Sequence, residues 1–250
     1  MLNYIKAELY RNFNRLYFWV YTGGVAIIAL ALNIIMGVKE GYNFINFTEL
    51  LSIVPNLFIL PVFLAVGIID IVISEENKNN TLKNIVCFGI SRNKLVLSKI
   101  IVGTILCFLS WSIILITFLG SGLALFGTGP NFSISILGEF ITKLFVAMPL
   151  WIGTIAVGTF MGFVCNSGNI LGFSYAMIFL FLKKIIAILS QLVWDKFKYA
   201  YDFLITIQLG NLAKPSLTSE DIRWAILIGI GYTLVFTALS LVYLKNKEIS

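Results

Sequence analysis

The chain has 250 residues, of which 59% are hydrophobic and 12% are charged, and its formal net charge is +6. Average soluble domains carry about twice that charged fraction, and they do not contain several apolar runs of about 20 residues, each long enough to cross a bilayer. The composition therefore excludes a soluble protein and indicates a multi-span membrane protein.

Residues 1–17 predict an amphipathic helix ahead of the first span, because apolar residues recur there at helical spacing. The apolar stripe consists of Leu2, Ile5, Leu9, Phe13 and Leu16, and the residues off it are Glu8, Arg11, Asn14 and Arg15. Such a helix is expected in the membrane interface, or it is only a positively charged anchor. A cleaved signal peptide is less favoured, because the apolar run is long and further spans follow.

Six apolar segments are long enough to form membrane-spanning helices. They are 18–38, 51–73, 100–126, 144–165, 169–189 and 222–244, within a single transmembrane domain over residues 1–250. The fold class is an all-α integral membrane protein. Lys and Arg concentrate in the two terminal segments and the 74–99 loop, whereas the opposing short loops carry only Lys39 and Lys143. The region from Lys183 to Arg223 carries six more basic residues on the opposing side, together with four carboxylates, which weakens this asymmetry without reversing it. The distribution predicts that both termini and the 74–99 loop are cytoplasmic.

The sequence of the 74–99 loop indicates that the loop contains a short helix. Ser74 is a suitable cap for a helix start, and Glu75 and Glu76 suit its first turn. Leu82, Ile85 and Val86 place apolar side chains on one helical face, with Lys83 off it. A short helix held between two spans would give a soluble partner a surface on which to push the membrane helices.

Two features of the spans are candidates for structural or functional roles. Asp70 is the only carboxylate well inside an apolar run, so it forms either a structural ion pair with Lys99 or Arg92 or part of an ion or proton pathway. Gly158 and Gly162 form a GxxxG motif, which predicts close helix packing.

Lys183 and Lys184 interrupt the fifth apolar run. Either they extend toward the headgroups from a tilted helix, or the chain breaks there and 183–221 forms partly inserted, re-entrant helices. An ordinary amphipathic outer loop over 190–221 is the alternative. The two lysines are candidates for contact with a substrate or with the lipid interface.

The sequence does not favour an enzyme. It has no histidine, no GxxxxGK[ST], GxSxG or HExxH motif, and three cysteines without CxxC spacing. Because Glu75 and Glu76 are adjacent, they do not share a helical face as an acid/base pair would. We expect no catalytic residue, metal ligand or cofactor in this chain. The basic residues are spread between apolar runs, so no nucleic-acid partner is expected either.

The stretch EENKNNTLKNIVCFGISRNKLVLSK and the six-span layout resemble the permease subunits of type-2 ABC exporters. The residues that match the family's pattern are Glu76, Thr81, Leu82, Lys83, Ser91, Arg92 and Lys99. Asn80 stands where Gly is usual, and Gly89-Ile90 stands where a Pro often precedes the Ser-Arg pair.

The resemblance implies that the 74–99 loop is a coupling helix seated in a groove of a separate ATPase subunit. The implied coupling residues are Glu75, Glu76, Thr81, Leu82, Lys83, Ile85, Ser91 and Arg92. Two permeases, identical or homologous, and two ATPases would form one exporter, with ATP and magnesium bound by the ATPases. The 183–221 region would correspond to the family's external re-entrant hairpin.

The small size and short external loops are similar to those of permeases for bacteriocin or lantibiotic immunity and for amphipathic-peptide export. This similarity implies a bacterial cytoplasmic membrane and export of an amphipathic peptide, a bacteriocin or a hydrophobic small molecule. A stand-alone secondary transporter or channel, or a membrane immunity protein without transport, is the alternative.

Overall fold

The computed structural model describes residues 1–40, 45–74, 90–165 and 167–246. Every regular element in these ranges is helical, which confirms the all-α class. The elements are α1 (Leu2–Phe13), α2 (Leu16–Glu40), α3 (Phe47–Ile53), the 3-10 helix η1 (Val54–Leu57), α4 (Leu60–Ile69), the π-helix η2 (Asp70–Ser74), α7 (Arg92–Phe126), α8 (Ile134–Val164), α9 (Gly168–Leu192), the 3-10 helix η3 (Asp195–Phe203), α10 (Ile205–Asn211) and α11 (Ser219–Asn246).

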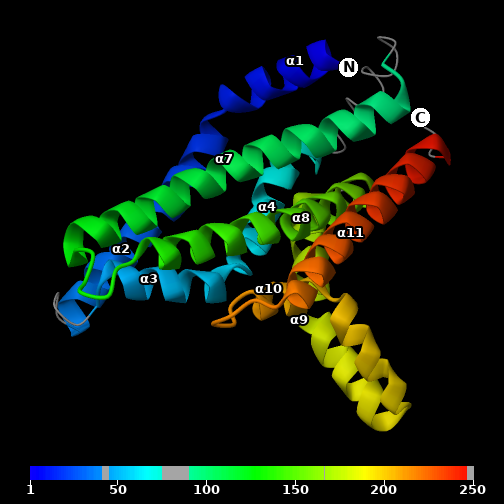
Figure 1. Ribbon diagram of the computed structural model, residues 1–250. Helices are drawn as coiled ribbons and strands as arrows, with labels where there is room; N and C mark the ends of the chain where they lie inside the picture. The colour runs from blue at the N-terminus through cyan, green and yellow to red at the C-terminus, as the bar shows by residue number, and fades with distance from the viewer. Residues whose placement is uncertain (41–44, 75–89, 166, 247–250) are drawn as a thin grey trace.

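Five of the described helices, α2, α7, α8, α9 and α11, are each long and apolar enough to cross a membrane. The bent pair Phe47–Leu57 and Leu60–Ile73 gives the expected number of six if it is counted as one span, which is then the second in chain order. Both chain termini lie at one end of the bundle, beside the start of α7 and the end of α11 (Figure 1). We call this the terminus end, and the opposite end the far end.

Polar side chains tie α2 to α7 along their length. The hydroxyl groups of Thr22 and Ser110 lie 3.0 Å apart. Nearer the far end, Asn33 Nδ2 donates to the Phe118 carbonyl at 2.6 Å and to Ser121 Oγ at 2.7 Å. Such hydrogen bonds hold membrane helices together, because lipid offers polar groups no alternative partner.

Small residues bring α8 and α11 into backbone contact (Figure 1). A Cβ on Gly229 would overlap the backbone of Pro149, and a Cβ on Gly153 would lie 3.1 Å from the Gly229 carbonyl oxygen. Only glycine allows this approach, which makes the α8–α11 pair the tightest backbone crossing among the glycine contacts described.

The second span, expected over 51–73, is bent by 61° between η1 and α4. Pro55 and Pro61 lie in the first turns of η1 and α4, and proline removes a backbone donor from a helix. Trp151 Nε1 donates to the Phe58 carbonyl at the bend, at 3.0 Å. The bend is stable within a membrane because a neighbouring helix supplies the hydrogen bond that the broken helix lacks.

α9 continues without a break through Lys183 and Lys184, so the alternative of a chain break there is wrong. From its first turns at the terminus end, α9 diverges from the bundle (Figure 1). η3 then returns along α9, and α10 packs against α8 and α11. Two short helices therefore occupy the connection between the fifth and sixth spans, and Ile205 and Leu209 of α10 are buried.

Candidate functional site

The strongest sequence candidate for a functional site was the 74–99 loop. Its predicted coupling residues Glu75, Glu76, Thr81, Leu82, Lys83 and Ile85 lie outside the described residues. The structure describes both ends of the loop, including the last turn of the second span and the start of α7 with Ser91 and Arg92. The contacts of these two ends define what the loop is attached to.

Arg92 attaches the second end of the loop to the C-terminus of α11. Its Nη1 atom donates to the carbonyls of Leu244 and Lys245, at 2.6 and 2.8 Å. The last carbonyls of a helix have no partner within that helix, and they carry the negative end of its dipole. The Arg92 guanidinium therefore caps α11 and joins it to the first turn of α7.

A buried ion pair attaches α7 to the amphipathic helix α1. Lys99 Nζ donates to Glu8 Oε2 at 2.8 Å, and Lys99 and Glu8 are 0% and 5% exposed. Lys99 Nζ also donates to the Val72 carbonyl at 2.9 Å, in the π-helix that leads into the loop. One lysine thus joins α1, α7 and the end of the second span.

Glu8 belongs to the packing face of α1, although it lies off the apolar stripe of the sequence. It is buried together with Ile5 and Asn12, and α1 packs against α7. Leu2 and Leu16, which belong to the apolar stripe, are 74% and 77% exposed. Glu8 can be buried because the Lys99 ammonium group replaces the water that would otherwise solvate its carboxylate. The ion pair therefore determines which face of α1 packs against α7.

Two cationic side chains donate hydrogen bonds to backbone carbonyls at the end of the second span. Besides Lys99 on Val72, Arg15 Nη1 donates to the Ile71 carbonyl over a longer 3.4 Å. A π-helix is rare and often marks a functional position. Both chain segments that flank the loop are therefore fixed to neighbouring helices by charged donors.

Asp70, the candidate intramembrane charge, does not form the expected ion pair in the described part of the chain. Lys99 donates to Glu8 and to the Val72 carbonyl, and Arg92 donates to a carbonyl at the C-terminus of α11. Asp70 is half-buried, and a side chain larger than hydrogen at Gly168 would overlap its carboxylate. The carboxylate therefore lies against the first turn of α9, where a helix dipole favours negative charge.

The GxxxG glycines lie against the second span. A Cβ on Gly158 would overlap Ile69, and a Cβ on Gly162 would lie 3.1 Å from Ile73 Cγ2. α8 therefore contacts the same segment that carries Asp70 and leads into the loop.

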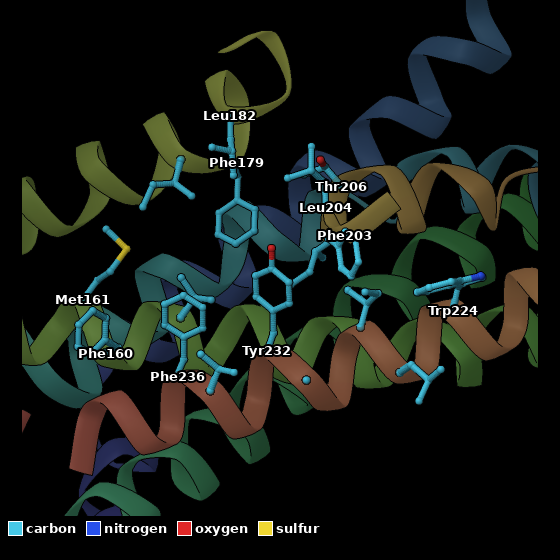
Figure 2. A pocket seen from close by; sticks show the side chains of 17 residues that line it. Phe160, Met161, Phe179, Leu182, Phe203, Leu204, Thr206, Trp224, Tyr232 and Phe236 are labelled. Atoms are coloured by element: carbon cyan, nitrogen blue, oxygen red, sulfur yellow. The ribbon is translucent and has the colours of Figure 1, made fainter. Parts of the chain in front are cut away.

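A groove of about 580 Å³ opens between α9 and the α8–α11 pair. Phe179 and Leu182 point into it from α9, toward Tyr232 and Phe236 of α11 (Figure 2). Lys183 and Lys184 come directly after Leu182 within α9, and both are exposed. Lys184 Nζ lies 5.7 Å from the centroid of the Phe181 ring.

The connection after α9 carries its own ion pair. Lys198 donates to Asp195 at 2.6 Å within η3. This hydrogen bond and the charge of the Asp195 carboxylate raise the pKa of Lys198. The pair is exposed, so it neutralises local charge without contributing much to stability.

Three contacting groups were not identified from the sequence as partners. Glu8, Arg15 and the indole of Trp151 each bind an atom of a helix distant in the chain. A charged residue beside a membrane span is a signal, because burial without a partner is costly. The partner itself could not be read from the periodicity of a single helix.

The comparisons with known proteins were consistent with this arrangement. The sequence model of one family, described as ABC-2 family transporter protein, matches residues 5–183. The matched range begins in α1, includes both ends of the 74–99 loop and extends into α9. The comparison with curated proteins found no match.

Proposed function

Because the chain belongs to the ABC-2 family of transporter proteins, we propose that it is the membrane-spanning subunit of an ATP-driven exporter whose ATPase is a separate chain. The family match is the observation that carries this proposal. It includes the residues on both sides of the 74–99 loop, where a coupling helix is expected.

The contacts of the loop ends support a coupling role. An ATPase that moves the 75–89 segment would act on α11 through Arg92 and on α1 through Lys99 and Glu8. It would also act on the second span through the Val72 carbonyl. The Lys99–Glu8 pair is buried, so separating its two charges would be costly, which favours joint movement of α1 and α7.

The terminus end is then the cytoplasmic end, in agreement with the distribution of Lys and Arg. We propose a bacterial cytoplasmic membrane, two ATPase copies and a second permease that is identical or homologous. ATP and magnesium would bind the ATPases, and this chain would supply no catalytic group. The proposed cargo is an amphipathic peptide, a bacteriocin or a hydrophobic small molecule, and this assignment is made by analogy.

Co-purification tests the proposal. The tagged chain is extracted from its native membrane in a mild detergent, and the proteins that accompany it are identified by mass spectrometry. A second sample carries a Gly/Ser linker in place of residues 75–89. We expect a P-loop ATPase with the native loop and its loss with the linker.

The control is a Gly/Ser replacement of residues 128–132, a loop at the far end. It should retain the ATPase. An ATPase absent from all samples would favour a stand-alone transporter, channel or immunity protein, and an ATPase retained with the 75–89 linker would place the docking site elsewhere.

A further inference from the structure

The groove between α9 and the α8–α11 pair is chemically suited to hydrocarbon. Its lining contains no charged side chain, and its polar side chains are those of Thr206, Trp224 and Tyr232. Its volume of about 580 Å³ lies within the range of ligand pockets, about 300–1,000 Å³. Because α8, α9 and α11 are membrane spans, the medium that surrounds the groove is the acyl region of the bilayer.

The lining argues against a polypeptide occupant. A peptide segment in this groove would bring backbone N–H and C=O groups into an apolar site, where each unsatisfied group is costly. An acyl chain brings no such groups. The aromatic side chains Phe179, Tyr232 and Phe236, which face the groove in Figure 2, offer flat apolar surfaces to it.

Two cationic side chains lie on the same helical faces as the residues that line the groove, one turn beyond them. Lys183 follows the lining residue Phe179 by four positions on α9, and Arg223 precedes the lining residue Leu227 by four positions on α11. Residues four apart lie on the same helical face. Lys183 lies in the second half of α9 and Arg223 in the first two turns of α11, and α9 and α11 are consecutive candidate spans. Both cations therefore lie toward the side of the membrane on which α9 ends and α11 begins.

These cations have no ion-pair partner within the described ranges, whereas neighbouring lysines do. Lys198 pairs with Asp195, and Lys214 pairs with Asp221 at 2.9 Å. Asp202, Glu220 and Asp221 are the carboxylates nearest in sequence to the lining residues Phe203 and Trp224; Asp202 and Glu220 are exposed, and Asp221 is the partner of Lys214. Lys183 and Arg223 therefore remain available for an external anion.

We infer that this groove binds an anionic phospholipid, with an acyl chain against Phe179 and Tyr232 and the phosphate drawn to that side of the membrane by Lys183 and Arg223. The ligand class follows from the apolar lining combined with unpaired cations at one end. This inference requires only that the chain lies in a membrane, and it holds whether or not an ATPase binds the 75–89 loop.

Lipid titration of the purified full-length chain, with any subunits that accompany it, tests the inference. Dioleoyl phosphatidylglycerol and dioleoyl phosphatidylcholine are added to the protein in detergent. Bound lipid is counted by native mass spectrometry, and the melting temperature is recorded. We expect one phosphatidylglycerol to be retained in preference to phosphatidylcholine, with a rise in melting temperature.

The charge of the site is tested by Lys183→Gln and Arg223→Gln. Each should weaken the apparent affinity for phosphatidylglycerol about fivefold, the usual contribution of one basic residue near an anionic lipid surface. Affinity for phosphatidylcholine should change little. Lys196→Gln is the matched control, because Lys196 is an exposed lysine on η3 that does not line the groove.

The groove itself is tested by Gly231→Leu. Gly231 lines the groove, and a Cβ built on it meets no atom within 4 Å, so the leucine fills the groove without disturbing the fold. Retention of phosphatidylglycerol should be lost. Gly172→Leu on α9 is the control, because its Cβ also meets open space but the residue does not line the groove.

Three outcomes would overturn the inference. Equal retention of the two lipids would remove the role of the cations, and normal lipid binding by Gly231→Leu would place the lipid elsewhere. If Gly231→Leu instead abolished self-association of the chain in size-exclusion chromatography, the groove would be an interface between two copies.

Discussion

Glu8 and Lys99 lie 91 positions apart in the sequence, yet their side chains meet at 2.8 Å in an almost fully buried salt bridge. Lys99 also binds the Val72 carbonyl, and Glu8 also binds Arg11 at 2.7 Å. This network connects the amphipathic helix α1 with the start of α7 and the end of the second span. It is the structural basis for the proposed coupling between the 74–99 loop and the rest of the bundle.

Glu8→Gln should destabilise the protein more than Lys99→Met does. Removing the carboxylate charge takes from the buried Lys99 its 2.8 Å ion-pair partner in α1, a change that typically costs about 3–5 kcal/mol of unfolding free energy. After Lys99→Met, Glu8 retains Arg11. Thermal unfolding in detergent measures both effects.

Lys6→Gln on the same helix is the control, because Lys6 is exposed. The double variant Glu8→Gln/Lys99→Met should recover part of the stability lost in Glu8→Gln, because it also removes the buried ammonium. Single variants as stable as Lys6→Gln would show that the salt bridge makes no net contribution.

Trp151→Phe should lower stability, because the Phe58 carbonyl at the bend would lose its 3.0 Å hydrogen bond. An unsatisfied buried acceptor costs about 1–3 kcal/mol. Trp111 provides a matched control. Its ring centroid lies 5.1 Å from that of Trp151, but its buried Nε1 has no partner in the described structure.

Trp111→Phe loses comparable ring packing but no hydrogen bond, so it should cost less stability than Trp151→Phe. The two variants are compared by melting temperature in the same detergent. Equal losses in both would mean that the packing of the indole rings, rather than the hydrogen bond to Phe58, stabilises the bent span.

Gly229→Ala should be more destabilising than Gly158→Ala. A Cβ at Gly229 overlaps the backbone of Pro149, which cannot move aside, whereas a Cβ at Gly158 overlaps the end of the Ile69 side chain. Overpacking typically costs about 1–3 kcal/mol. Gly120→Ala is the control, since a Cβ there meets no atom within 4 Å.

The loss in Gly158→Ala should be reduced by adding Ile69→Val, which shortens the side chain that the new methyl meets. Melting temperatures of the single and double variants measure this relief. If Gly158→Ala were as stable as Gly120→Ala, the glycine would not be needed for close packing of α8 on the second span.

Glu76→Lys or Lys83→Glu should uncouple ATP hydrolysis from transport while the chain still inserts into the membrane. A like-charge contact at a docking surface opposes the correct register of the two partners. We expect at least about a tenfold loss of ATP-dependent export, the effect of about 1.4 kcal/mol at the interface. Lys78→Glu is the matched control, because Lys78 is a lysine of the same loop that is not among the residues matching the family's pattern.

Export is measured by comparing the secreted peptides of cells that carry each variant, and ATP hydrolysis is measured on the purified complex. Normal export by Glu76→Lys and Lys83→Glu would count against the coupling role of the 75–89 segment.

The existence of the spans was predictable because each requires about 20 apolar residues, a property of one segment alone. The contacts between segments were not. The burial of Glu8 depends on Lys99, which a helical stripe does not reveal, and the expected pairing of Asp70 overlooked the closer approach of Gly168. The groove depends on the angle at which α9 leaves the bundle, which is set by packing and not by the sequence of α9.

Site-specific cross-linking tests the central claim most directly. A photoreactive amino acid is placed at Leu82, Ile85 or Val86 in the loop, and at the exposed Ile134 at the far end for comparison. After irradiation of intact cells, the account predicts an adduct with a P-loop ATPase from at least one loop position and none from Ile134. No ATPase adduct from any loop position, or an equal adduct from Ile134, would contradict it.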